Sequence, residues 1–250
     1  MGSNSFNWDC EQARRDVLLI SEVLGRHNVI NPWIKVDTVS DVFQQCEQCK
    51  SKRHKKCLGW TLAFRERQAL VFPSLSLENR TVKVELCGRF CARRKNTGDW
   101  EKRPLSECSG AISVLEPTTD RILSRIHIDL ATTDAQEHEP VWHIQFGGLP
   151  GPGHEKPETR WLKVPRLPSQ PLDFPLLVEL VLYNFKPKLW SQLAVDSVWR
   201  RMVKRSESLV LPHYFEHWAS YWNMRHNDQG SSSWLAHQSN LSGKWKPWAV

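Results

Sequence analysis

The 250-residue chain lacks any long apolar run. A membrane-spanning helix needs roughly 20 consecutive apolar residues, and no segment of the sequence approaches that length. Residues 1–8 contain neither a basic stretch nor an apolar one, so the sequence predicts no secretory signal. These absences argue against a membrane partner and favour a cytoplasmic protein.

Tyrosine is scarce and tryptophan is abundant, with three Tyr against thirteen Trp. Large rigid indole rings suit both core filling and contact with partners. No internal repeat is visible in the sequence. Hydrophobic residues make up 40% of the chain and charged residues 24%, which is the ordinary balance of a globular protein with one large domain or two small ones.

The net charge of +7 is unevenly distributed along the chain. Residues 50–67 carry seven basic groups and one acidic group, and residues 160–250 carry twelve and six. Residues 110–159 are the acidic part, with three basic groups and eight acidic ones. Local basicity of this kind favours a binding surface over a general solubility device.

The basic clusters predict a nucleic-acid-binding surface, for DNA or RNA, because guanidinium and ammonium groups contact phosphates. Nearby Trp60 or Trp100 could stack on bases. The alternative is a solvated surface, the usual fate of a charge run. The candidate contacts are Lys50, Lys52, Arg53, Lys55, Lys56, Arg93, Arg94, Arg200, Arg201, Lys204 and Arg205.

The seven cysteines are odd in number and fall largely in one third of the chain. In a reducing compartment such a cluster points to metal or free thiols before disulfides. Cys46-Glu-Gln-Cys49 supplies half of a tetrahedral structural zinc site. The other half is predicted from Cys57 with His54, or from Cys87 and Cys91. Free, partly buried thiols are favoured over this zinc site, and a redox pair is less favoured than either because no helix-opening thioredoxin context surrounds the motif.

Two segments with period-two alternation, residues 125–130 and 142–148, predict an antiparallel strand pair joined by a long loop. In each segment the apolar residues fall on one face of the predicted sheet. The residues predicted on the other face are Arg125, His127, Asp129, His143 and Gln145.

This polar face has two interpretations. His127, Asp129 and His143 could act as metal ligands or as base and orienter in a metal-dependent hydrolase. No His-Glu-x-x-His signature accompanies them, and buried His and Asp otherwise form hydrogen-bonded networks. We favour the network, because the cluster has few ligands and no metalloenzyme signature. The acidic setting of residues 110–159 is tolerable for a metal ion, but it suits a structural role equally well.

The remaining periodicities predict an α+β fold with a central antiparallel or mixed sheet of about six or seven strands, an N-terminal helix and a C-terminal helical section. We predict helices over 9–26, 38–45, 173–185, 190–209 and 213–224, with a break at Leu211-Pro212. Residues 60–64 and 69–72 are predicted to pair around a charged turn, and further strands are predicted over 82–90 and 111–115.

Four regions follow from this pattern. Residues 1–148 hold the N-terminal helix and the Cys-containing β-rich region, and 149–172 form a Pro/Gly-rich linker. Residues 173–225 form a helical section packed on the sheet, and 226–250 form a tail containing Trp234, Trp245 and Trp248. An unpatterned tail with three tryptophans favours docking onto another protein subunit, which is the adaptor hypothesis.

Residues 110–190 resemble a group of uncharacterised bacterial proteins with an Arg-x-His-x-Asp strand, a His-x-Gln-Phe-Gly-Gly strand, a Pro-punctuated linker and a helix ending in Asn-Phe. The resemblance implies no established activity, but such proteins are associated with mobile-element and antiviral genes. The cysteine region has no counterpart. The matching residues are Arg125, His127, Asp129, His143, Gln145, Gly147, Gly148, Pro165, Pro168, Asn184 and Phe185.

Taken together, the sequence predicts a nucleic-acid-binding and non-catalytic subunit of a larger bacterial complex. The metal-dependent hydrolase and the protein adaptor are the alternatives.

Overall fold

A computed structural model describes residues 10–29, 43–45, 59–64, 69–77, 80–93, 107–130, 142–147 and 167–227. The strands are β1 (Phe43–Gln45), β2 (Gly59–Phe64), β3 (Leu70–Leu77), β4 (Arg80–Arg93), β5 (Glu107–Leu115), β6 (Ile122–Leu130), β7 (Trp142–Phe146) and β8 (Leu167–Pro168). The helices are α1 (Cys10–Arg26), α3 (Phe174–Phe185), α4 (Pro187–Leu193) and α5 (Ser197–Asn227).

The described strands form one eight-stranded sheet in the order β1-β2-β4-β5-β6-β7-β8, with β3 beside β4. Every pairing between them is antiparallel. The predicted α+β class is therefore confirmed: a largely antiparallel sheet carries an N-terminal helix and C-terminal helices.

Strand β4 is the spine of the sheet, because β5 pairs along one of its edges while β2 and β3 share the other. Phe64, near the end of β2, lies opposite Gly88, and Leu70, at the start of β3, lies opposite Leu86. β2 and β3 are thus two collinear parts of one interrupted strand. The predicted pairing of 60–64 with 69–72 is wrong, because both segments pair with β4.

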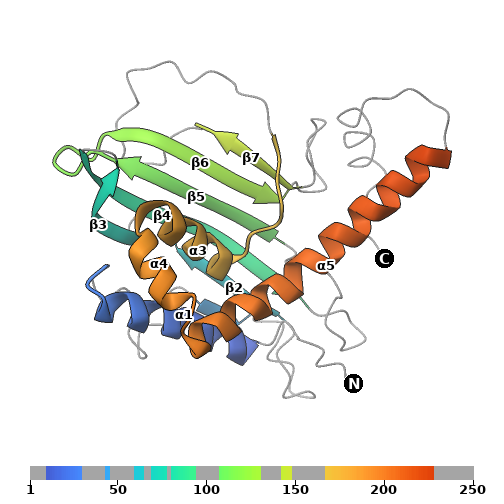
Figure 1. The fold of residues 1–250 in the computed structure, drawn as a ribbon, viewed down its shortest axis with the longest axis horizontal. Coiled ribbons are helices and arrows are strands. Elements are labelled where there is room, and N and C mark those ends of the chain that lie inside the picture. Colours follow the sequence, from blue (N-terminus) through green and yellow to red (C-terminus); the bar gives the residue numbers. More distant parts are fainter. Residues whose placement is uncertain are drawn as a thin grey trace.

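The helices lie on one face of the sheet, where α1, α3, α4 and the first half of α5 cover the strands (Figure 1). A single hydrophobic core fills the space between the layers and includes Ile20, Leu86, Ile128, Leu177 and Trp199. Helix α3 packs close to β5 at Gly110, where an added Cβ would stand 2.5 Å from Leu177 Cδ1. A side chain at position 110 would force the Leu177 side chain to move, because interiors are closely packed.

Helix α3 begins as predicted at Asp173, whose side chain accepts a hydrogen bond of 3.2 Å from Leu176 N. Helix α5 departs from the prediction in two ways. It runs through Pro212 without ending, so the predicted break at Leu211-Pro212 is wrong. The predicted helix over 190–209 is also divided, because α4 ends at Leu193 and α5 begins at Ser197. The buried face of α5 carries Trp199, which is 1% exposed, whereas Val198 is 51% exposed.

The two edge strands occupy segments for which we predicted other structure. Residues 43–45 form β1 and pair with β2, although the sequence favoured a helix over 38–45. Pairing with the sheet edge overrides the weak local preference there. Residues 167–168, at the end of the predicted linker, form β8 and pair with β7. Within the described residues, no helix has the length and apolar character needed to cross a membrane.

Candidate functional site

The predicted polar cluster on β6 and β7 is assembled as expected from the alternation. His127 lies opposite Gln145, and Asp129 lies opposite His143 in the antiparallel register. These four side chains therefore share the sheet face that points away from α3, since Ile128 on the same strand belongs to the core.

Neighbouring strands extend the polar face. Ser113 lies between Arg125 and Glu85 in the register, and Ser109 lies between Asp129 and Arg89. Arg125 and Glu85 are each 8% exposed and His143 is 3% exposed, so this face is more buried than an ordinary solvent-facing strand surface. On the opposite face of β7, Phe146 is 47% exposed.

His127 is held in its neutral form by its surroundings. Burial lowers the pKa of the imidazole, and the positive charge of Arg125 lowers the pKa further, while Asp129 opposes both. The buried Nε2 atom of His127 has no hydrogen-bond partner among the described residues. A neutral imidazole beside a carboxylate can exchange protons or complete a hydrogen-bonded network.

The described residues contain no group of three or more His, Cys, Asp or Glu side chains that could hold a metal ion. The hydrolase hypothesis for His127, Asp129 and His143 stays a prediction.

Three described cysteines divide between the two faces of the sheet, and none forms a disulfide. Cys87 and Cys91 share the polar face, as their spacing predicts, and the Cys91 thiol lies 3.3 Å from Thr61 Oγ1. Cys108 lies on the helix-covered face and donates a hydrogen bond of 3.3 Å to the carbonyl of Leu172.

Several predicted site residues lie outside the described residues. They are the zinc candidates Cys46, Cys49, His54 and Cys57, the basic residues Lys50, Lys52, Arg53, Lys55, Lys56 and Arg94, and the tryptophans of the tail. The structural zinc and the adaptor role of the tail stay predictions.

The basic set on α5 separates into two kinds of residue. Arg200, Arg201 and Lys204 are exposed and form no ion pair in the described part of the chain. Arg205 instead pairs with Asp16 of α1, and both side chains are 11% exposed. Arg205, which we predicted as a nucleic-acid contact, is thus engaged by Asp16, and its guanidinium joins two helices.

Two further basic segments attach to neighbouring positions of the sheet. Gly59, where the chain enters β2, is the register partner of Arg93, where the chain leaves β4. Lys56 precedes Gly59 by three residues, and Arg94 follows Arg93 directly. Gly59 and Arg93 thus mark one point of the sheet, and both basic segments are close to it in the sequence.

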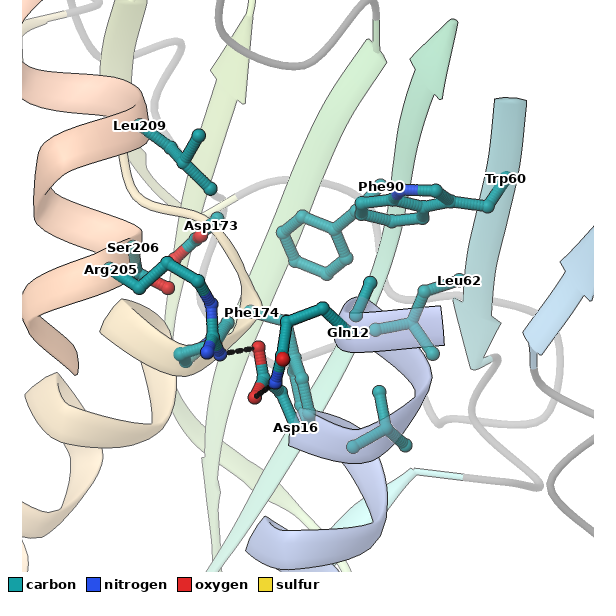
Figure 2. A pocket seen from close by; sticks show the side chains of 13 residues that line it. Gln12, Asp16, Trp60, Leu62, Phe90, Asp173, Phe174, Arg205, Ser206 and Leu209 are labelled. Atoms are coloured by element: carbon teal, nitrogen blue, oxygen red, sulfur yellow. Dashed lines mark hydrogen bonds and ion pairs between the residues drawn. The ribbon is translucent and has the colours of Figure 1, made fainter. Parts of the chain in front are cut away.

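A small cavity of about 40 Å³ lies near that point, between α1, α3, α5 and the sheet (Figure 2). It has room for only a few water molecules. Its apolar wall includes Trp60, Leu62, Phe90 and Phe174. Trp60 is 5% exposed, so its ring fills the core and the predicted stacking of bases on it is wrong.

The polar wall of the cavity comes from three helices. Arg205 reaches from α5 to Asp16 on α1, and Gln12 Nε2 donates a hydrogen bond of 3.2 Å to Asp16 Oδ1 (Figure 2). Ser206 hydrogen-bonds the carboxylate of Asp173, which is 5% exposed. The cluster therefore fastens α1, α3 and α5 to one another.

Burial raises the pKa of Asp173 from 3.8 to about 6, although hydrogen bonds from Ser206 and the Leu176 backbone oppose the rise. The folded protein thus binds this proton more tightly than the unfolded chain does. The resulting penalty on folding is present above pH 6 and disappears as the pH falls towards 3.8.

We expect Asp173→Asn to be more stable than the wild type by about 3 kcal/mol at about pH 8, with the difference shrinking to nearly zero at about pH 4. Asparagine keeps the helix cap, because its amide oxygen still accepts from Leu176 N, and it removes the buried charge. Urea unfolding at several pH values measures the difference.

The matched control is Asp196→Asn. Asp196 caps α5 in the same way, accepting from Val198 N at 3.0 Å and Trp199 N at 2.8 Å, but its side chain is exposed. If Asp173→Asn gives no gain that grows with pH, the assignment of a buried carboxylate is wrong.

Comparison with protein-family models, with curated proteins and with solved structures gives no match for this chain.

Proposed function

We propose that the protein binds nucleic acid as a non-catalytic subunit of a larger assembly. The observation that carries this proposal is the set of exposed cations on α5: Arg200, Arg201 and Lys204 have no acidic partner among the described residues. Cations in stable surface ion pairs are already partly neutralised, whereas these three are available to phosphates.

The register of the sheet gives further support. Lys50–Lys56 and Arg94 are attached at Gly59 and Arg93, which are direct neighbours. Trp60, beside Gly59, lines the same cavity as Arg205 and Leu209 of α5. The N-terminal part of β2 and the basic half of α5 therefore meet at one cavity, and both basic segments are close in the sequence to the Gly59–Arg93 pair.

The kind of assembly is a proposal drawn from the resemblance of residues 110–190. A mobile-element or antiviral complex in a bacterial cytoplasm would supply both the nucleic acid and a protein partner for the tryptophans of residues 226–250.

We expect the triple variant Arg200→Glu, Arg201→Glu and Lys204→Glu to lose most of its affinity for short labelled oligonucleotides. Each phosphate contact releases condensed counterions, so losing three contacts flattens the slope of log K against log salt by about 2 to 3. Fluorescence anisotropy between about 50 and 200 mM salt measures this slope.

The control variant carries the same change in net charge at Arg15, Arg26 and Arg121. These arginines are also exposed, but each pairs with a glutamate: Glu11, Glu22 or Glu116. We expect their reversal to leave the salt slope nearly unchanged. Equal losses in the two variants would contradict a specific surface on α5 and indicate a response to net charge alone.

A further inference from the structure

We propose that the outer face of α5 binds single-stranded nucleic acid, with phosphates on Arg201 and Lys204 and a base stacked on Phe215. This inference rests on the proposed function and names the class of nucleic acid.

Continuity of α5 through Pro212 puts the cations and the aromatic ring on one helix face. Lys204 and Phe215 are eleven residues apart, close to three full turns of 3.6 residues, so the two side chains leave the helix in nearly the same direction. Arg201 and Ser208 belong to the same face by their spacing. A break at Pro212 would have placed the basic and aromatic residues on separate elements.

Exposure along this face agrees with the helical spacing. Arg201, Lys204, Ser208, Phe215 and Ala219 are all exposed. Phe215 is 57% exposed, and its neighbour Tyr214 packs edge-on against it at 5.5 Å between ring centroids. The ring is braced by this contact and still presents a large apolar surface to solvent.

The positions that follow continue the aromatic character. In the sequence of the same helix, Trp218 and Trp222 come three and seven residues after Phe215. This C-terminal half of α5 projects beyond the sheet (Figure 1). A nucleic-acid strand bound along this half of α5 would therefore meet no other described element.

Cations at one end and an aromatic ring at the other favour a single strand over a duplex. Bases in a duplex are stacked on each other and present only their edges, whereas an unpaired base offers its face to an aromatic ring. Lys204 and Phe215 are separated by about 16 Å along the helix axis, a distance that several nucleotides of an extended strand span. Acidic residues near this stripe are few, with Glu207 and Glu216 at its margins.

The test compares the full chain with Phe215→Ala, using short single-stranded and duplex oligonucleotides of the same sequence. We expect tighter binding of the single strand by the wild type and a loss of about tenfold or more in Phe215→Ala, because stacking on one aromatic side chain contributes that much. The salt slope should not change, since no cation is removed. Phe215→Trp should keep the wild-type affinity.

Val198→Ala is the matched control, because Val198 is an exposed apolar residue of the same helix whose direction from the helix axis differs from that of Phe215 by about 100°. Wild-type affinity of Phe215→Ala for the single strand, with the charge-reversed variant still impaired, overturns the single-strand assignment and leaves the proposed function in place. If Phe215→Ala has unchanged affinity but elutes as a smaller species than the wild type in size-exclusion chromatography, this face binds a second copy of the chain instead. No oligonucleotide binding by the wild type overturns both proposals.

Discussion

Replacing Asp16 with Ala is expected to lower the free energy of unfolding by about 3 to 5 kcal/mol, the cost of leaving one member of a buried ion pair without its partner. The Arg205 side chain is 11% exposed and lies between α5 and α1. Burial lowers the pKa of its guanidinium, but arginine stays protonated at neutral pH, so the charge persists. Urea unfolding of the variant measures the loss.

The double variant Asp16→Leu with Arg205→Met distinguishes the cost of an unpaired charge from the cost of lost packing around the pair. Both charges are then removed, and apolar replacements of buried pairs are often neutral or stabilising. We therefore expect the double variant to recover most of the loss. Glu22→Ala, which breaks the exposed Glu22–Arg26 pair, should cost less than about 1 kcal/mol. If Asp16→Ala also lowers the free energy of unfolding by less than about 1 kcal/mol, the Asp16–Arg205 pair does not behave as a buried ion pair.

Glu179→Gln is the second change with a large expected effect, a loss of about 1 to 3 kcal/mol. One carboxylate accepts hydrogen bonds from two indoles: Trp190 Nε1 donates to Oε2 at 2.6 Å, and Trp199 Nε1 donates to Oε1. Glutamine offers one acceptor oxygen, and its NH₂ group would face the second indole N–H. Trp199 is 1% exposed, so water cannot replace the lost partner there.

The variant Glu179→Gln with Trp190→Phe tests this explanation directly. Removing the Trp190 N–H leaves the glutamine oxygen for Trp199, so part of the stability should return. Glu179→Ala should be worse than Glu179→Gln, because both indoles then lack an acceptor. Thermal or urea unfolding of the four proteins decides the matter, and equal stability of wild type and Glu179→Gln would contradict the shared-acceptor geometry.

Local pattern predicted much of the fold. The alternation in residues 125–130 and 142–148 predicted both strands and the face of each polar residue, because a sheet has a side-chain period of two. Asp173 predicted the start of α3, since a carboxylate before an apolar run is a strong cap.

Features that depend on distant partners were not predictable from local pattern. Nothing in residues 60–72 indicates that both segments pair with β4, because that depends on a strand of fourteen residues further along the chain. Pro212 reads locally as a helix break, costing about 3 kcal/mol in a helix interior. Burial of Met202 and Val210 on the inner face of α5 offsets that cost.

The sequence contains a signal for some of the buried charges whose partners we did not predict. Asp16 stands four residues before Ile20 on the apolar stripe of α1, and Arg205 stands between Met202 and Leu209 on that of α5. A charge on an apolar stripe requires a partner. Glu179, the only charged residue within α3, carries the same signal.

The most direct test of nucleic-acid binding is the salt dependence of oligonucleotide affinity for the full wild-type chain and its Arg200→Glu, Arg201→Glu, Lys204→Glu variant. Our account predicts steep loss of wild-type affinity between about 50 and 200 mM salt and a slope that is flatter by about 2 to 3 in the variant. No measurable binding at the lowest salt, or identical slopes for the two proteins, would contradict it.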